Sequence, residues 1–322
     1  MEPTAVTHTI PFQLVDAFTA APFNGNQAGV VLDATGLSER QMQRIAREIN
    51  ASETVFIFPR DDGRPALIRW FTPGCEVGFC GHATLAAAHA LAERAWAADQ
   101  HSPEDLPIRP RSGVELSFES AAGRLELRSD IVPDQPEVPL WWLKMPSPAL
   151  SPASLARLKT CELLGLTTDD LWPGQPMMRT RDDDVIVLIR SWQRLIELRP
   201  NMTELAEWSR RNGNVRGWCV ATPDTQNAAI HVASRFFAPA AGVAEDPVTG
   251  SVHGPLAAML VQADMVALND GRALLRCHQA IPGDRGGLVF ALAETDGTAP
   301  RVTIGGQCQT TLRGSLRTPP DE

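Results

Sequence analysis

The pattern of hydrophobic and polar residues divides the first part of the chain into strands and a helix. Hydrophobic positions in "FQLVDAF" and "AGVVL" flank the turn-forming stretch "PFNGNQ" and predict two strands. The next segment, "GLSERQMQRIAREI", predicts a helix with Ser38 as its N-cap and Gln41 completing a capping box. The apolar face of this helix consists of Met42, Ile45 and Ile49.

A second pair of strands and a second helix follow. The segments "ETVFIF" and "ALIRWF" are rich in β-branched and aromatic residues and predict strands. The segment "GHATLAAAHALAERAW" has almost no polar face in its first turns, which is typical of a helix surrounded by protein.

The later part of the chain repeats this alternation of strands and helices. We expect a helix over residues 154–164 that ends at Gly165, and a helix in "MTELAEW" that ends near Gly213. The segments "DVIVLIRS", "GWCVAT" and "AAIHVASRFFA" predict strands, and a further helix follows Gly250.

A Pro-rich passage over residues 130–152 is the best candidate for a crossover between the two parts, and its pair of tryptophans indicates packing. We therefore predict a first half over residues 1–130 and a second half over 131–305. The C-terminal residues 306–322 can return to the first half.

Two stretches far apart in the sequence resemble each other. "RWFTPGCEVGFCGH" ends at His82, and "RFFAPAAGVAEDPVTGSVH" ends at His253. Their alignment places Gly81 against Gly250, each followed by a helix rich in Ala and Leu, and the second copy is longer before its glycine. A repeat of this kind predicts two similar subdomains related by a pseudo-twofold axis, with chance similarity as the alternative.

Composition limits the classes of partner. The chain has 322 residues, a hydrophobic fraction of 43% and a formal net charge of -9, which is typical of a globular enzyme and argues against nucleic acid or an anionic membrane as a partner. The N-terminus has no basic segment before an apolar core, and no window has the length of a membrane span. We therefore expect a cytoplasmic protein.

Six cysteines are scattered along the chain without the spacing of a zinc site or a disulfide framework. We expect free thiols and no metal. They are Cys75, Cys80, Cys161, Cys219, Cys277 and Cys308.

The repeat predicts an anion site if the two halves face each other. Both helix N-termini would then carry unpaired N–H groups and a partial positive charge into one cleft. Small residues there would let a carboxylate approach the backbone: Gly81, Ala83, Gly250 and Ser251. Pro255 fits this picture as a residue of the first helical turn.

Three further side chains supply groups for moving a proton on and off carbon without a cofactor: Glu53, His82 and Asp246. Each has a structural alternative. Glu53 could be an exposed residue of an alternating strand, while His82 and Asp246 could satisfy backbone groups at a helix start.

The segments "GNQAGVV", "SETVF", "RWFTP", "CGHATLAAAHAL", "RFFAP", "EDPVTGSVH" and "GDRGG", in this order, resemble the PhzF-like phenazine biosynthesis family of the diaminopimelate epimerase-like superfamily. The resemblance implies an α+β fold of two halves, each a curved mixed sheet around a central helix, with the active site between them. The chain departs from the family pattern at Gln27, "EVGF" and "TGSV".

By this resemblance, Glu53 is the general acid and base, His82 positions the substrate, Asp246 is the motif aspartate and Ser251 is the motif serine. The implied activity is a cofactor-independent isomerisation of a small carboxylate-bearing metabolite, such as trans-2,3-dihydro-3-hydroxyanthranilate. The resemblance also suggests a homodimer.

Other classes of function fit these residues less well. A two-thiol racemase or epimerase could use Cys80, but "AEDPVTGS" offers no second thiol. A hydrolase could use Ser251, His253 and Asp246, but "GSVHG" is not the G-x-S-x-G elbow. A non-catalytic binding protein stays open, although Glu53 argues against it. Nucleotide binding would rest on isolated glycines alone.

Overall fold

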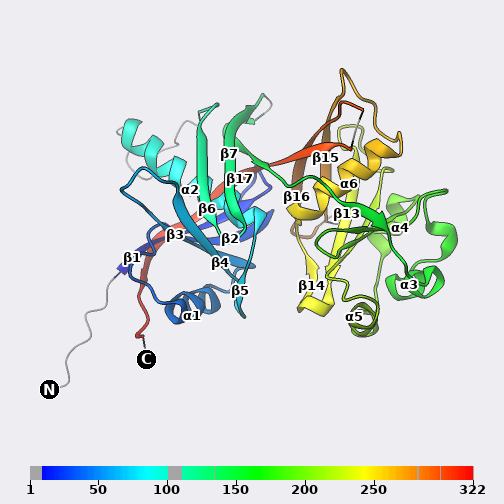
Figure 1. Ribbon diagram of the computed structural model, residues 1–322, viewed down its shortest axis with the longest axis horizontal. Helices are drawn as coiled ribbons and strands as arrows, with labels where there is room; N and C mark the ends of the chain where they lie inside the picture. The colour runs from blue at the N-terminus through cyan, green and yellow to red at the C-terminus, as the bar shows by residue number, and fades with distance from the viewer. Residues whose placement is uncertain (1–8, 101–110, 134, 281–282, 298, 322) are drawn as a thin grey trace. The chain divides into compact units, whose positions relative to one another are not determined.

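The structure is a computed structural model that describes residues 9–100, 111–133, 135–280, 283–297 and 299–321. It divides into two compact units (Figure 1). The first comprises Met1–Lys144 and Gly306–Glu322, and the second comprises Met145–Gly305. The expectation that the N-terminus has no targeting segment concerns residues 1–8 in part. These residues lie outside the described ranges. No helix within the described ranges is long and apolar enough to cross a membrane.

The first unit contains a mixed sheet. β1 pairs antiparallel with both β2 and β17, β2 pairs parallel with β3, and β3 pairs antiparallel with β4. β4 pairs antiparallel with the short β5 and parallel with β6, which continues into the antiparallel β7 and β8. The strands are β1 (Thr9–Ala17), β2 (Asn26–Val31), β3 (Glu53–Phe58), β4 (Ala66–Phe71), β5 (Glu76–Val77), β6 (Glu115–Ser120), β7 (Gly123–Val132), β8 (Gln135–Lys144) and the C-terminal part of β17 (Arg301–Arg317).

Two helices of this unit confirm the sequence predictions. α1 (Glu39–Ile49) begins with the expected capping box, because Ser38 Oγ accepts from Gln41 N at 3.2 Å and Gln41 Oε1 accepts from Ser38 N at 3.0 Å. α2 (Gly81–Gln100) packs against β1, β2, β3 and β8, and its first turns are buried all round, as the absence of a polar face predicted.

The predicted boundary between the halves is wrong by one strand. Residues 131–144 were expected in the second half, but β8 pairs antiparallel with β7 and belongs to the first unit. Trp141 is fully buried and stacks on Trp96 with ring centroids 6.3 Å apart. Pro139 lies opposite Ile131, next to a shift in register, where a strand tolerates proline. The crossover therefore begins only after Lys144.

The second unit contains a mixed sheet of its own. β9, β10 and β11 are antiparallel neighbours, β11 pairs parallel with β12, and β12 pairs antiparallel with β13. β13 pairs antiparallel with β14 and parallel with β15, from which β16 and the start of β17 continue antiparallel. The strands are β9 (Leu150–Pro152), β10 (Met178–Thr180), β11 (Val185–Leu188), β12 (Trp218–Thr222), β13 (Val232–Ala238), β14 (Val243–Asp246), β15 (Arg272–Gln279) and β16 (Gly287–Glu294).

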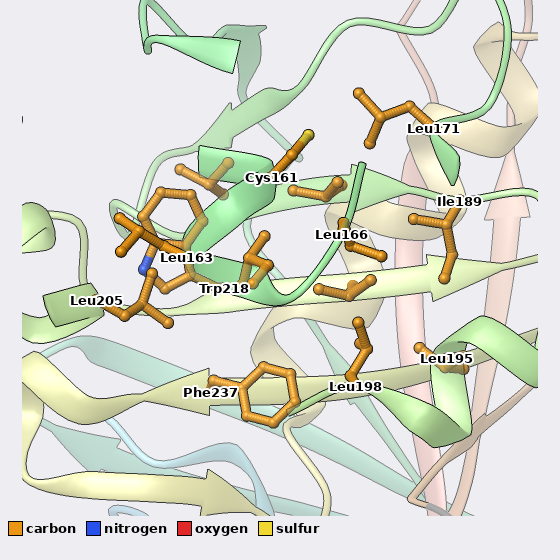
Figure 2. Close-up of a cluster of buried hydrophobic side chains, with 14 of the residues drawn as sticks. Cys161, Leu163, Leu166, Leu171, Ile189, Leu195, Leu198, Leu205, Trp218 and Phe237 are labelled. Atoms are coloured by element: carbon orange, nitrogen blue, oxygen red, sulfur yellow. The ribbon is translucent and has the colours of Figure 1, made fainter. Parts of the chain in front are cut away.

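Three helices build an apolar core on this sheet. They are α3 (Arg157–Leu164), α4 (Trp192–Glu197) and α5 (Met202–Arg211). Figure 2 shows the resulting cluster, in which leucines of the helices and connections surround Trp218 of β12 and Phe237 of β13. Trp218 Nε1 donates to Ser209 Oγ at 2.9 Å, so its polar atom is satisfied within the core. α3 ends at Gly165 as predicted, whereas the sequence analysis did not predict α4.

The central helix of the second unit is α6 (Gly250–Gln262), which packs against β16 and is buried along nearly its whole length. The expectation for Pro255 is wrong, because α6 begins at Gly250 and the proline lies inside the helix, beyond the first turn. Since proline has no N–H, the Ser251 carbonyl receives no helical hydrogen bond from this position.

Each unit thus combines a mixed sheet with a buried helix, consistent with the predicted α+β class.

Candidate active site

The repeat found in the sequence has the same internal contacts in each unit. In the first unit, Arg69 of β4 binds Glu76 of β5 through Nε and Nη2, both at 2.6 Å, and its guanidinium lies 5.2 Å from the centre of the Phe71 ring. This arrangement fixes the strand that leads toward α2.

The second copy repeats this arrangement around Arg235 of β13. Its Nε and Nη2 donate to the two carboxylate oxygens of Glu245 of β14 at 2.7 and 2.8 Å, and its guanidinium lies 4.9 Å from the Phe237 ring centre. The agreement extends to contacts that the alignment alone did not include. Chance similarity of two turns is therefore disfavoured.

The first unit brings together Glu53, His82 and Cys80. Glu53 is the first residue of β3, and His82 is the second residue of α2. Nε2 of His82 lies 3.2 Å from Oε2 of Glu53, with side-chain exposures of 9% and 21%. Nδ1 of His82 lies 3.4 Å from Sγ of Cys80, which is buried. One imidazole thus connects a carboxyl group to a thiol.

The start of α2 holds this group in place. Thr84 donates to the Cys80 carbonyl through its backbone N–H at 3.1 Å and through Oγ1 at 2.6 Å. Gly81 precedes His82, and an added Cβ at Gly81 would make only ordinary contacts with Phe79 and Leu143 at 3.9 to 4.0 Å. Packing therefore does not require glycine at this position. Ala83 is buried in the helix.

Cys80 belongs to a group of three possible metal ligands that the spacing of the cysteines did not indicate. Ligand atoms of Glu53, Cys80 and His82 all lie within 4.8 Å of one another, a group that could hold a metal ion. A metal ion would have to bind a single imidazole nitrogen together with the other two ligands. Here Nδ1 approaches the thiol and Nε2 lies at ion-pair distance from the carboxylate, without the geometry of a hydrogen bond, so the two ring nitrogens face different partners. None of the six cysteines, all of which lie in the described ranges, is part of a disulfide.

The second unit places Asp246 at the end of β14, beside the start of α6. Its carboxylate accepts a hydrogen bond from Thr249 Oγ1, and its carbonyl accepts from Gln279 Nε2 at 2.7 Å. Thr249 N donates to Gln279 Oε1 at 2.9 Å. These bonds connect Asp246 to the start of α6, and its role at a substrate stays a prediction. Gln279 was not predicted for this site.

Ser251 lies in the first turn of α6, directly after the buried Gly250, and its hydroxyl accepts from Arg216 Nη2 at 3.2 Å. Arg216 also forms a two-bond ion pair with Asp184, which is 1% exposed. Burial raises the pKa of Asp184 to about 6, while the Arg216 guanidinium opposes that shift. Neither residue was predicted, because no local sequence pattern indicates that Arg216 contacts both Ser251 of α6 and Asp184.

The contacts of His253 oppose a hydrolase. The ring is fully buried, with Nδ1 2.8 Å from the Thr249 carbonyl and Nε2 3.2 Å from Ser234 Oγ. Burial lowers the pKa of His253 to about 4. Both ring nitrogens therefore have partners other than Ser251, and the ring is not arranged to activate that serine.

The cysteines of the second unit oppose a two-thiol mechanism. Cys161, Cys219 and Cys277 are all buried, and burial raises the pKa of each thiol, to about 12 for Cys277. Thiols in such surroundings stay protonated and unreactive. They are poor candidates for the second base of a racemase.

Relatives described as isomerases match this chain over most of its length. An uncharacterized isomerase of Halalkalibacterium halodurans is 34% identical over 310 residues, covering 96% of this chain and 98% of that protein. An uncharacterized isomerase of Escherichia coli strain K12 is 33% identical, covering 91% and 93% of the two chains.

Solved structures show the same fold. A phenazine biosynthesis protein of the PhzF family from Bacillus anthracis matches with a TM-score of 0.82 and 25% identity, over 96% of this chain and 99% of that one. A probable proline racemase from Agrobacterium radiobacter matches with a TM-score of 0.60 and 11% identity, over 97% and 94%, which is a likeness of fold alone. The family model described as phenazine biosynthesis-like protein matches residues 15–314, and the chain therefore belongs to that family.

Proposed function

We propose that the chain is an isomerase that moves a proton within a small carboxylate-bearing molecule, with Glu53 as both acid and base. The observation that carries this proposal is the 3.2 Å approach of His82 Nε2 to Oε2 of a partly exposed Glu53. Membership of the family and the isomerase names of the relatives support the same class of reaction.

One carboxylate is sufficient for such a reaction. Glu53 accepts a proton as a C–H bond of the substrate breaks, and the electron pair moves into the conjugated system. The same carboxyl group then releases the proton to a different carbon, so a new C–H bond forms and the double bond shifts. Nε2 of His82 lies beside Oε2, so the imidazole can support the charged form of Glu53 between the two proton transfers.

We propose that each unit offers a carboxylate backbone N–H groups at the start of its own central helix, at Gly81 and Ala83 of α2 in the first unit and at Gly250 and Ser251 of α6 in the second. The partial positive charge at a helix N-terminus favours an anion. We propose a role in substrate binding for Asp246 as well, because its carboxylate lies beside the start of α6, where it accepts a hydrogen bond from Thr249 Oγ1. No cofactor and no nucleic acid enter this proposal, and a cytoplasmic homodimer stays a prediction from the sequence.

The test is proton exchange in D2O, followed by NMR on small conjugated carboxylates, beginning with trans-2,3-dihydro-3-hydroxyanthranilate. Glu53→Gln keeps the size of the side chain and removes the base, so turnover should fall by about a hundredfold or more while ligand affinity barely changes. Glu48→Gln, at an exposed position of α1, is the matched control and should behave like the wild type. Normal turnover by Glu53→Gln at saturation would contradict the assignment.

A further inference from the structure

Cys80 has no role in the proposed proton transfer, yet its thiol lies 3.4 Å from Nδ1 of His82. The other ring nitrogen, Nε2, lies 3.2 Å from Oε2 of Glu53. Cys80 is buried and immediately precedes α2, where Thr84 binds its carbonyl twice. The thiol is therefore held in a defined position beside the imidazole.

The direction of the hydrogen bonds follows from the chemistry of the three groups. The 3.2 Å contact between Nε2 of His82 and Glu53 does not have hydrogen-bond geometry and does not fix the tautomer by itself. An ionised carboxylate only accepts hydrogen bonds, so Glu53 favours a neutral imidazole with its proton on Nε2. Nδ1 of the same ring is then an acceptor, and a protonated thiol is the group that can donate to it. Only one tautomer of His82 satisfies both contacts.

We propose that Cys80 is a positioning residue that fixes His82 in the tautomer with its proton on Nε2, so that His82 donates to the Glu53 carboxylate. This inference rests on the proposed role of Glu53 as acid and base. A hydrogen bond donated to a carboxylate favours its charged form. Cys80 thereby keeps Glu53 ready to accept a proton at lower pH than it otherwise would.

The first measurement needs no substrate. In protein labelled with ¹⁵N at histidine, a His82→Asn variant assigns the His82 signals, and nitrogen shifts and couplings report the tautomer. Wild type should show a protonated Nε2 and an unprotonated Nδ1. Cys80→Ala should release this preference, so the two nitrogen shifts move toward each other. Cys75→Ala is the matched control, because Cys75 is an exposed thiol of the same connection between β4 and α2.

The second measurement is the pH dependence of kcat/KM with a substrate from the exchange screen. In Cys80→Ala the acidic limb should move up by roughly half a pH unit, and kcat/KM at pH values on that limb should fall about threefold. Cys80→Ser keeps a donor on a shorter bond and should restore part of both changes. Unfolding curves identify any variant that fails to fold, and Cys80→Ser then provides the test.

An unchanged His82 tautomer in Cys80→Ala overturns the proposal. So does a released tautomer with no movement of the acidic limb, since His82 would then not act on Glu53. Failure of the proposed function gives a different result: Glu53→Gln would turn over normally, whatever the tautomer of His82.

Discussion

Nε2 of His82 lies 3.2 Å from Oε2 of Glu53, although one residue begins a helix and the other begins a strand. β3 pairs with β2, and α2 packs against both strands, so the sheet and the buried helix together fix the distance. A carboxyl group with 21% side-chain exposure can meet a small molecule while Oε2 stays next to a buried imidazole. This relationship supports chemistry in which one carboxyl group both takes and returns a proton.

Chelation of metal ions should leave turnover unchanged, because proton transfer by Glu53 needs no metal. Added Zn²⁺ should inhibit, since Glu53, Cys80 and His82 could rearrange around a single ion, and EDTA should reverse that inhibition. Turnover is measured after dialysis against EDTA and again with added Zn²⁺ or Mg²⁺. Activity that disappears with EDTA and returns with either metal would refute this mechanism.

Replacement of Gly250 by Val should weaken ligand binding while Glu53 stays intact. Gly250 is the first residue of α6, and a branched side chain there would keep a carboxylate from the N–H groups of the first turn. Calorimetric titration with small carboxylates measures the affinity, and urea unfolding shows whether the variant folds. Gly254→Ala is the control, because an added Cβ there would come only within 4.0 Å of Ile304. Equal affinity for a folded Gly250→Val variant and the wild type would remove Gly250 from the site.

The two arginines of the repeat should differ in their contribution to stability. Arg235 is 5% exposed and donates to Glu245 and to the Leu195 and Leu198 carbonyls, so Arg235→Met should cost about 3 kcal/mol of unfolding free energy. Arg69 has a side-chain exposure of 27%, and Arg69→Met should cost about 1 kcal/mol or less. Urea unfolding measures the loss of unfolding free energy in each variant. Equal losses would show that burial of the arginine does not control its contribution to stability.

Local patterns were sufficient to predict several elements and part of the site. The capping box of Ser38 and Gln41 and the apolar start of α2 depend on neighbouring residues, so the sequence contains their signals. The repeat also showed where the two central helices begin. His82 was identified at the start of the first of these helices and Glu53 through the segment "SETVF", and the structure places the two side chains 3.2 Å apart.

Contacts between distant segments could not be predicted in the same way. Arg216 binds Asp184 and Ser251, which are 32 and 35 residues away, and no periodicity connects such positions. Prolines hid β8 because they usually argue against a strand, although pairing with β7 and burial of Trp141 hold it in the sheet. The thiol of Cys80 went unnoticed as a partner of His82 because its contact depends on the turn into α2.

His253 should make stability depend on pH. The pKa of His253 is about 4 in the folded protein and 6.5 for the free side chain. Between these two pH values, His253 is therefore protonated in the unfolded chain and neutral in the folded protein. The stabilising contribution of the neutral ring is complete above pH 6.5 and is lost as pH falls toward 4, by up to about 3 kcal/mol. Urea unfolding from pH 7.5 to 4 should therefore show a steeper loss in wild type than in His253→Gln. Burial raises the pKa of Asp184 to about 6, so this group titrates in the same pH range and stabilises the folded protein as pH falls. Its effect is common to both proteins and cancels in the comparison. Parallel curves for the two proteins would show that His253 is not buried as a neutral ring.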